Sequence, residues 1–326
     1  SLVRAAAKNF RDVLIVVSPA DYDEVIAQLD RPGGPAPAFR LSLAQRAFAH
    51  TAAYDGAIAA SLLDVTADTT YQRTPPAALP AMMSMRFTKR SDLRYGENPH
   101  QPAAWYISDA DPSAWGFGHA RLVQGKELSY TNLLDLDAAA RIVLEFEEAA
   151  AVVVKHMNPS GVATAASLAD AYTLARDADA MSAFGGIIGL NREIDAATAR
   201  AIASTKIDAV VAPAVSTEAA PILAARTQMR VVVASFPPGG VAGPELRSIL
   251  GSVLVQERDR VVEAQVAWAT SALRVVTKRQ PSAAEWTALR FAWRICAHVK
   301  SNTVIFTAAD RTLASGAGQM SRVDAV

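Results

Sequence analysis

Cysteine is almost absent from this chain of 326 residues, which contains only Cys296. A single cysteine excludes an intramolecular disulfide bond. It also excludes every zinc site that needs paired cysteines, such as those of zinc fingers, zinc ribbons and zinc-dependent deaminases. Structural and catalytic sites built on cysteine pairs are therefore ruled out.

Charge of one sign is also lacking, because 32 lysines and arginines balance 32 aspartates and glutamates. A neutral chain is not expected to capture DNA, RNA or anionic lipid broadly, although a local cluster of arginines could hold a small phosphate ligand. Long hydrophobic runs are missing too: residues 149–154 are far too few to span a bilayer, and the first residues show no signal peptide. We expect a cytoplasmic protein that binds neither nucleic acid nor membranes.

The sequence does contain enough apolar material for folded domains. Hydrophobic residues make up 51% of the chain and charged residues 20%, which is too apolar for a disordered protein, and 326 residues suffice for two domains. The chain opens at Ser1 rather than Met, and it closes soon after an irregular Gly-rich segment. We expect it to be a piece of a longer protein.

The first part of the chain is expected to contain one strand and two helices. Residues 12–17 (DVLIVV) are a β-branched run typical of a buried strand, and residues 18–21 (SPAD) make the capping pattern that starts a helix. The Ala-rich residues 41–64 predict a second helix, capped by Ser42. Residues 66–84 are polar and rich in proline, so they predict a linker and a domain boundary near residue 85.

Helices and strands alternate in the second part of the chain. Helices are expected at residues 133–148, 167–180, 195–204, 217–225 and 282–299, and strands at residues 149–154, 187–190, 209–211, 230–234 and 303–307. Such alternation predicts a layered α/β fold with largely parallel strands.

The strongest candidate site follows the strand at residues 149–154. Lys155 and His156 are adjacent ionisable residues at its end, and residues 158–161 (NPSG) predict a turn. Both side chains would then lie at the carboxyl edge of the sheet, where open α/β folds bind ligands. A neutral histidine can take a proton from an amine near pH 7, and an adjacent ammonium can stabilise a developing oxyanion. The alternative is a surface lysine beside a histidine that is bonded into a turn.

Three further segments are rich in polar residues or glycine. Residues 93–101 (LRYGENPHQ) carry Arg94 and Tyr95, which suit a phosphate and a base but also fit a polar loop with a salt bridge. Residues 185–186 are glycines that would let a ligand approach the backbone, and residues 316–322 (GAGQMSR) are similar to an anion-binding loop. Neither the dinucleotide-binding pattern nor the Walker pattern occurs in the sequence.

Six segments resemble consecutive signatures of one family, the bifunctional AICAR transformylase/IMP cyclohydrolases of purine biosynthesis, where AICAR is 5-aminoimidazole-4-carboxamide ribonucleotide. They are LRYGENPHQ, QGKELSYTNLLDLDAA, VVVKHMNPSGVA, DADAMSAFGGIIGLNREID, HVKSNTVIF and GAGQMSRVDAV. The first residues, with RAAAKN, resemble the tail of the family's cyclohydrolase domain. The resemblance therefore covers the whole chain in the family's order.

The resemblance implies an α/β protein in three parts. Residues 1–65 would be the C-terminal part of a methylglyoxal-synthase-like cyclohydrolase domain, and residues 66–85 a linker. Residues 86–326 would be a C-terminally truncated transformylase domain made of two cytidine-deaminase-like lobes. Both active sites would lack residues from the missing parts.

The resemblance also implies an activity: formyl transfer from the co-substrate 10-formyltetrahydrofolate to the 5-amino group of AICAR, followed by ring closure to IMP, without a catalytic metal. It matches His156 to the catalytic acid/base, Lys155 to an assisting residue and Lys8 to the catalytic lysine of the cyclohydrolase. The residues that match nucleotide contacts are Arg94, Tyr95, Gly185, Asp208, Asn302 and Arg322. In the family, the positions of Asn302 and Arg322 are supplied by the partner subunit of a homodimer.

Two alternatives belong to other classes. One is a nucleotide-binding module that has lost catalysis and acts in regulation or assembly, although the presence of Lys155, His156, Asn302 and Arg322 argues against it. The other is a zinc deaminase of similar fold, which the cysteine count contradicts.

Overall fold

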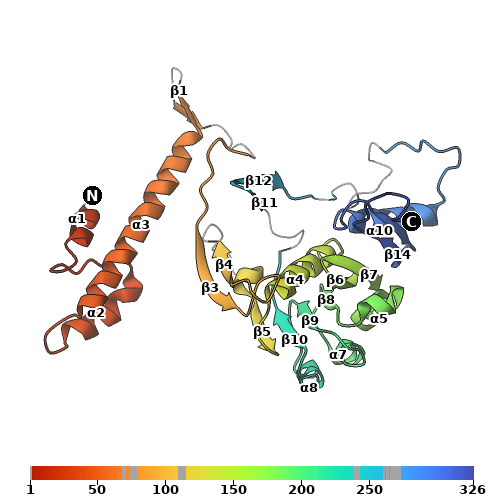
Figure 1. Ribbon diagram of the computed structural model, residues 1–326, viewed down its shortest axis with the longest axis horizontal. Helices are drawn as coiled ribbons and strands as arrows, with labels where there is room; N and C mark the ends of the chain where they lie inside the picture. Colours follow the sequence, from red (N-terminus) through yellow and green to blue (C-terminus); the bar gives the residue numbers. More distant parts are fainter. Residues whose placement is uncertain are drawn as a thin grey trace. The chain divides into compact units, whose positions relative to one another are not determined.

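The computed structural model describes residues 2–67, 71–73, 79–108, 115–237, 243–259, 261, 264 and 273–326. The chain divides into two compact units, Ser1–Ser84 and Met85–Val326, which are described separately (Figure 1). Which domain of the family each unit represents stays a prediction.

The first unit is mostly helical. Its elements are α1 (Leu2–Lys8), the 3-10 helix η1 (Pro19–Asp21), α2 (Tyr22–Leu29), α3 (Pro37–Leu63) and the antiparallel strands β1 (Val65–Ala67) and β2 (Tyr71–Arg73). Ala7 of α1 packs with Ala44 and Ala47 of α3 in a small core, and Ile15 and Val17 lie against it partly buried. Helices α1 and α3 thus meet through small side chains.

Two predictions for this unit are wrong. Residues 12–17 pair with no strand among the described residues and are not a strand, because backbone hydrogen bonds from a neighbouring strand define one. The helix expected to be capped by Ser42 begins earlier, at Pro37, since proline suits the first position of a helix. Ser42 lies inside α3 and donates to the carbonyl of Phe39 at 2.7 Å. The cap at Ser18 is confirmed, with its hydroxyl accepting from the Ala20 amide.

The second unit is built on a six-stranded sheet in the order β5-β10-β9-β8-β6-β7. Its strands are β5 (Arg121–Gln124), β6 (Ala149–Lys155), β7 (Asn158–Ala165), β8 (Ile187–Leu190), β9 (Ala209–Ala212) and β10 (Arg230–Val233). The helices are α4 (Tyr130–Val143), α5 (Leu168–Ala178), α6 (Ala180–Ala183), α7 (Ala196–Ala203), α8 (Ala219–Ala224) and α10 (Ala283–Cys296), with the 3-10 helix η2 (Phe117–His119). Further antiparallel pairs are β3 (Phe87–Leu93) with β4 (Ala103–Ser108), β11 (Pro244–Ile249) with β12 (Ser252–Glu257), and β13 (Val304–Thr307) with β14 (Thr312–Gly316).

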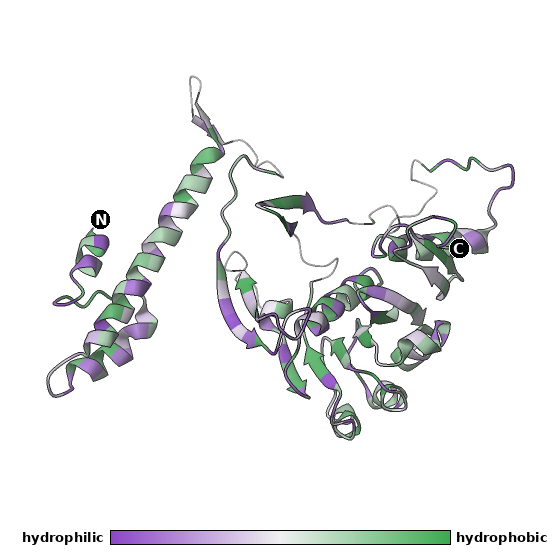
Figure 2. Cartoon of the chain, in the orientation of Figure 1, coloured by the Kyte–Doolittle hydropathy of each residue, from purple (hydrophilic) through white to green (hydrophobic). Residues whose placement is uncertain are grey.

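Helices cover both faces of the sheet. Helices α5, α7 and α8 pack on one face, where Ala151 and Val153 of β6 point. Helices α4 and α10 pack on the other face, where Val152 and Val154 point, and all four side chains are fully buried. Because both faces are covered, residues 149–154 of β6 are all apolar instead of alternating with polar residues. Figure 2 shows the central strands as mostly apolar beside helices of mixed character.

The predicted α/β layering is confirmed, but the prediction of largely parallel strands is wrong. Within this sheet, β8–β9 and β9–β10 are parallel, whereas β5–β10, β6–β8 and β6–β7 are antiparallel. The main reason is that β6 returns directly as β7 through a short turn, and two strands joined in that way must be antiparallel.

The predicted strands of the second unit correspond to β6, β8, β9, β10 and β13, and the predicted helices to α4, α5, α7, α8 and α10. The clearest shift concerns α4, which begins at Tyr130 rather than at residue 133 and ends at Val143 rather than at residue 148. Ser129 and Asn132 form a reciprocal capping box, and this box starts the helix early.

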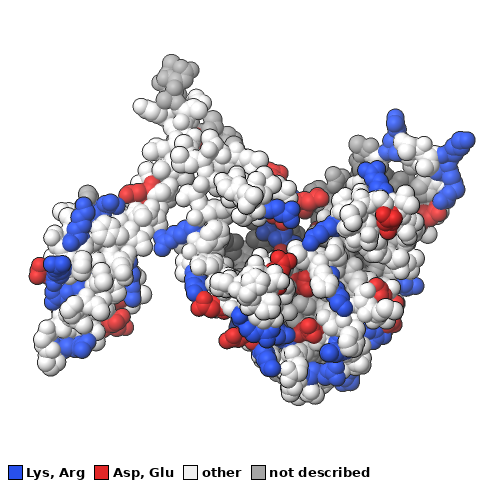
Figure 3. All heavy atoms as spheres, viewed as in Figure 1, with Lys and Arg blue, Asp and Glu red and all other residues white. Residues whose placement is uncertain are grey.

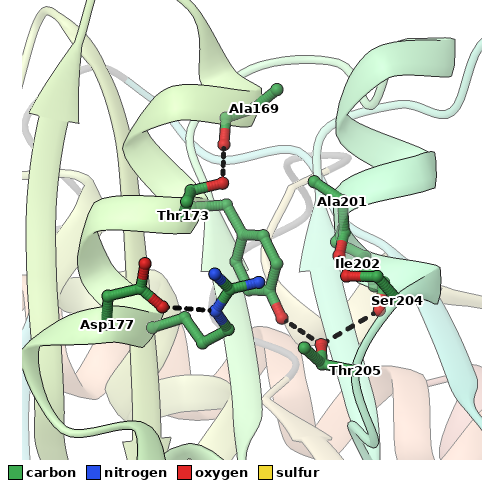
Figure 4. Close-up of polar contacts among 9 residues, drawn as sticks. Ala169, Thr173, Asp177, Ala201, Ile202, Ser204 and Thr205 are labelled. Atoms are coloured by element: carbon green, nitrogen blue, oxygen red, sulfur yellow. Dashed lines mark hydrogen bonds and ion pairs between the residues drawn. The ribbon is translucent and has the colours of Figure 1, made fainter.

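Helix α5 lies tightly against β7 and is tied to the end of α7. A Cβ atom on Gly161 would lie 1.8 Å from the carbonyl oxygen of Ala175, so only glycine fits beneath the helix. The fully buried Tyr172 has its hydroxyl 2.6 Å from the Thr205 hydroxyl, which donates to the carbonyl of Ile202 at 3.1 Å (Figure 4). Burial raises the pKa of Tyr172. Because the Thr205 hydroxyl donates its one proton to Ile202, the tyrosine hydroxyl is the donor in its contact with Thr205.

Among the described residues, no helix has both the length and the apolar character that crossing a bilayer requires. On the face drawn in Figure 3, lysines and arginines are interspersed with aspartates and glutamates.

Candidate active site

The candidate site begins at the turn between β6 and β7. Lys155 pairs with Asn158 across the two strands, so His156 and Met157 alone form the connection. Both have left-handed backbone conformations, with φ of 52° and 65°. Two consecutive positive φ values are typical of the tight hairpin turns that match the twist of the flanking strands. His156 is exposed at the tip of this turn.

The turn predicted at residues 158–161 is therefore misplaced, because these residues are the first of β7. Pro159 is tolerated there since β7 is an edge strand of the sheet, where a missing backbone N–H costs little. The pairing shifts between Val153 and Val154, next to the proline.

Three side chains from different elements contact the turn. The Asp135 carboxylate of α4 accepts the backbone N–H of Met157 at 2.7 Å. The Asn158 side-chain amide donates to the His156 carbonyl at 3.1 Å. Lys300, after α10, places its ammonium 3.8 Å from the Met157 sulfur. The turn is thus held by helix α4 on one side and by the segment after α10.

Lys155 joins a second group of predicted residues. Its ammonium donates to the carbonyl of Phe184 at 3.0 Å, immediately before Gly185. Gly185 has a φ of +71°, and a Cβ atom on it would lie 4.0 Å from the Asp208 carboxylate. Lys155, Gly185 and Asp208 are therefore neighbours. Lys206 lies over the ring of Phe184, 5.0 Å from its centroid.

Lys155 lies at the carboxyl end of its strand as expected, but the residues around it do not follow the carboxyl ends of neighbouring parallel strands. Because β6 is antiparallel to β8, Val154 near its end pairs with Ile187 at the beginning of β8. Ile187 in turn pairs with Ala209 at the beginning of β9. The predicted residues thus gather at the carboxyl end of β6 but at the amino ends of β8 and β9.

The charges around the site are of both signs. Burial raises the pKa of Asp135, against the opposing effects of the Met157 amide and the charges of His156 and Lys300. Hydrogen bonds from Ser182 lower the pKa of Asp179, with a smaller contribution from Lys155. An exposed imidazole beside an ammonium and near carboxylates can exchange protons with a bound ligand and stabilise negative charge.

Asn302 and Arg322 belong to two segments that are hydrogen-bonded together. The Asn302 side-chain amide donates to the carbonyls of Gln319 and Met320, at 3.1 and 3.3 Å. Arg322 follows two residues later and is exposed. Since Lys300 contacts the turn of its own chain, this pair of segments lies on the same side of the unit as His156.

Arg94 and Tyr95 follow β3 and contact each other. The Arg94 guanidinium donates to the Tyr95 hydroxyl at 2.7 Å and lies 4.6 Å from the centroid of its ring. In the described part of the chain, no hydrogen bond or ring contact joins either of them to Lys155 or His156. Lys8, the last residue of α1, belongs to the other unit.

Sequence analysis missed Asp135 and gave no role to Met181 and Phe184. Nothing in the pattern around Asp135 distinguishes it from a surface carboxylate of a helix. Met181 is 88% exposed and Phe184 60% exposed, and no local pattern in the sequence predicts this exposure. Among the described residues, no three His, Cys, Asp or Glu side chains gather as a metal site would require.

Comparison with known proteins identifies relatives along the entire chain. A family model described as AICARFT/IMPCHase bienzyme matches residues 6–326. Proteins named bifunctional purine biosynthesis protein PurH are 47% identical over 332 residues in Myxococcus xanthus, 47% over 333 in Synechococcus elongatus and 44% over 339 in Anaeromyxobacter dehalogenans strain 2CP-C. These matches cover 100% of this chain but only 62%, 61% and 62% of the respective relatives. With a family model that matches from residue 6 to the last residue and relatives this similar over its full length, the chain belongs to the AICARFT/IMPCHase bienzyme family.

Proposed function

We propose that the second unit carries out formyl transfer from 10-formyltetrahydrofolate to the 5-amino group of AICAR, which the complete protein couples to ring closure to IMP. The names of the relatives support a role in purine biosynthesis. The observation that carries the proposal is the exposed His156 on a left-handed turn directly after Lys155. Unusual backbone conformations of this kind concentrate at active sites.

His156 is proposed to be the general base. The 5-amino group of AICAR is a weak nucleophile, because its lone pair is delocalised into the imidazole ring and the carboxamide. A neutral imidazole can take the amine proton as the nitrogen attacks the formyl carbon. When the bond between the formyl carbon and the N10 atom of the folate breaks, N10 takes up a proton and the carbonyl re-forms.

Lys155 and Asn302 are proposed to stabilise the oxygen that becomes negative when the nitrogen attacks. Losing one such donor typically costs about 3 kcal/mol of barrier. Arg94 and Arg322 are proposed to bind the 5′-phosphate, with Tyr95, Gly185 and Asp208 contacting the rest of the nucleotide. Binding at a phosphate remote from the reacting atoms orients the amine toward the formyl carbon.

The site offers a surface suited to the folate. The Phe184 ring is exposed on the residue whose carbonyl accepts from Lys155, and Met181, three residues earlier, is exposed as well. Such apolar groups fit a flat heterocycle. 10-Formyltetrahydrofolate would supply the formyl group as a co-substrate. The proposed steps need proton transfer and charge stabilisation only, so we propose no catalytic metal.

The proposed organisation follows the family. Residues 1–65 would be the C-terminal part of a methylglyoxal-synthase-like cyclohydrolase domain with Lys8 as its catalytic lysine, and residues 66–85 the linker. Residues 86–326 would form most of a transformylase domain of two cytidine-deaminase-like lobes, in a homodimer whose subunits share the active sites. Since phosphorylated purine intermediates cross membranes poorly, we propose a cytoplasmic location.

Two variants, one in each proposed active site, test this function in the protein expressed from its complete gene. His156→Ala is expected to lower formyl transfer about 10²- to 10⁴-fold, the range for loss of a general base, and to leave cyclisation of formyl-AICAR near normal. Lys8→Ala is expected to do the opposite. Each activity is followed separately by its absorbance change. Loss of both activities in the His156→Ala protein would contradict the assignment of this unit to formyl transfer.

A further inference from the structure

We infer that Asp135 is a positioning residue for formyl transfer, because its carboxylate fixes the two-residue turn that presents His156. This inference rests on the proposed role of His156. It concerns a residue on helix α4, which precedes β6 in the chain and has no place among the matched site residues.

The turn needs such support because its own sequence does not favour it. Turns with positive φ at both central residues are strongly enriched in Asn-Gly, Asp-Gly and Gly-Gly. Here the two positions are occupied by His156 and Met157, with φ of 52° and 65°. Left-handed residues with bulky side chains persist only where the surrounding structure determines them.

Asp135 stabilises the turn through one hydrogen bond. Its Oδ1 accepts the backbone N–H of Met157 at 2.7 Å, the length of a charge-assisted hydrogen bond. The carboxylate is half-buried on a helix whose start is fixed by the Ser129 capping box and whose neighbouring residue, Leu136, is fully buried. A rigid element therefore positions the acceptor, and the acceptor positions the turn.

The charges that face Asp135 suit the same role. His156, on the turn, and Lys300, after α10, both act on the carboxylate and oppose the effect of its burial. An ionised Asp135 attracts the imidazolium that forms when His156 takes the amine proton. Asp137, one residue beyond Leu136, instead forms an ion pair with Arg141 at 2.7 Å, so the two aspartates of α4 have different partners.

Four variants of the protein, expressed with its flanking sequence, separate positioning from general stability. Asp135→Ala removes the acceptor, Asp135→Asn keeps an oxygen but removes the charge, and Asp137→Asn is the matched control. Met157→Gly in the Asp135→Ala background favours the left-handed turn without the carboxylate. The readouts are kcat and KM for AICAR, the pH profile of kcat and the exchange rate of the Met157 amide.

We expect Asp135→Ala to lower kcat by about 10- to 100-fold, as misplacement of a reacting group does, with KM for AICAR changed less than about threefold. Amide exchange at Met157 should accelerate. Asp135→Asn should have a higher kcat than Asp135→Ala and an altered pH profile. Adding Met157→Gly to Asp135→Ala should also raise kcat above that of Asp135→Ala alone. Asp137→Asn should have the kcat of the unchanged protein.

Unchanged kcat and unchanged Met157 exchange in Asp135→Ala would overturn the inference. So would a loss of activity that neither Asn at residue 135 nor Gly at residue 157 recovers, because that pattern indicates a structural role. Failure of the proposed function has a different signature: His156→Ala would keep formyl transfer, while Asp135→Ala would still accelerate exchange at Met157.

Discussion

The Glu285 carboxylate, in the first turn of α10, shows how one side chain can stabilise an element in a pH-dependent way. The Arg279 guanidinium donates two hydrogen bonds to this carboxylate, at 2.8 and 2.9 Å, and the Ser282 amide donates a third at 2.8 Å. These contacts, with Arg279 as the largest cause, lower the pKa of Glu285 from 4.5 to about 2.

Because the pKa of Glu285 is lowered in the folded protein, its ionised form favours folding. That contribution is fully present above pH 4.5 and is lost as the pH falls toward 2. Arg279→Gln should move the pKa of Glu285 back toward 4.5. Carboxyl NMR titration of both proteins checks this, and a Glu285 that titrates near 4.5 with Arg279 intact would contradict it.

At the scale of single residues, the sequence draws attention to local chemistry but not to geometry, and the proposed roles of Lys155 and His156 stay predictions. Lys155 and His156 stand out because ionisable residues directly after a buried strand are unusual. The left-handed turn could not be predicted, since neither residue is glycine or asparagine and the hydrogen bond from Met157 goes to Asp135, distant in the sequence. Gly161 was expected in a turn, but it is required by the closeness of α5.

At the scale of helices and strands, the sequence predicts starts better where a serine or aspartate caps a helix directly. Ser167, Asp195 and Ser282 each accept a hydrogen bond from the third residue beyond, as their patterns indicate. Strands such as β5 and β7 were missed because they are short or contain proline. Residues 12–17 were overpredicted because an apolar run indicates burial, whereas a strand also needs a partner.

Two serine variants distinguish a real cap from an apparent one. Ser167 accepts the Asp170 amide at 3.1 Å, so Ser167→Ala should lower the free energy of unfolding by about 1 kcal/mol. Ser42 lies inside α3, where alanine is a better helix former than serine. Ser42→Ala should therefore change the free energy of unfolding by no more than about 0.5 kcal/mol. Urea unfolding measures both variants, and equal losses would contradict the assignment of the caps.

For the whole molecule, the α/β class followed from the alternation of elements, but the strand directions did not. Direction depends on how each strand is connected, and the two-residue connection between β6 and β7 leaves no mark in the apolar pattern. Contacts such as that between Lys300 and Met157 join residues far apart in the chain, and no local pattern predicts them.

The proposed sharing of active sites between subunits is a property of the assembly and can be tested by mixing. Inactive His156→Ala and Arg322→Ala proteins, dissociated and reassembled together, should form hybrid dimers with one intact site, so about a quarter of the unchanged activity should return when subunits pair at random. Formyl transfer before and after mixing is the measurement. No recovery of activity would contradict sharing and would indicate that Arg322 serves the site of its own chain, in which Lys300 contacts the turn.

The register of β7 against β6 also couples the proposed base to the packing of the sheet. A shift of β7 by one residue against β6 would reverse the facing of β7, exchanging Val162, which packs toward α10, with Ala163, which packs toward α5. It would also move Gly161 from the one place where α5 leaves no room for a side chain. The position of the proposed base is therefore coupled to the packing of β7, and residues 156–161 are expected to tolerate insertions less well than the open loops do.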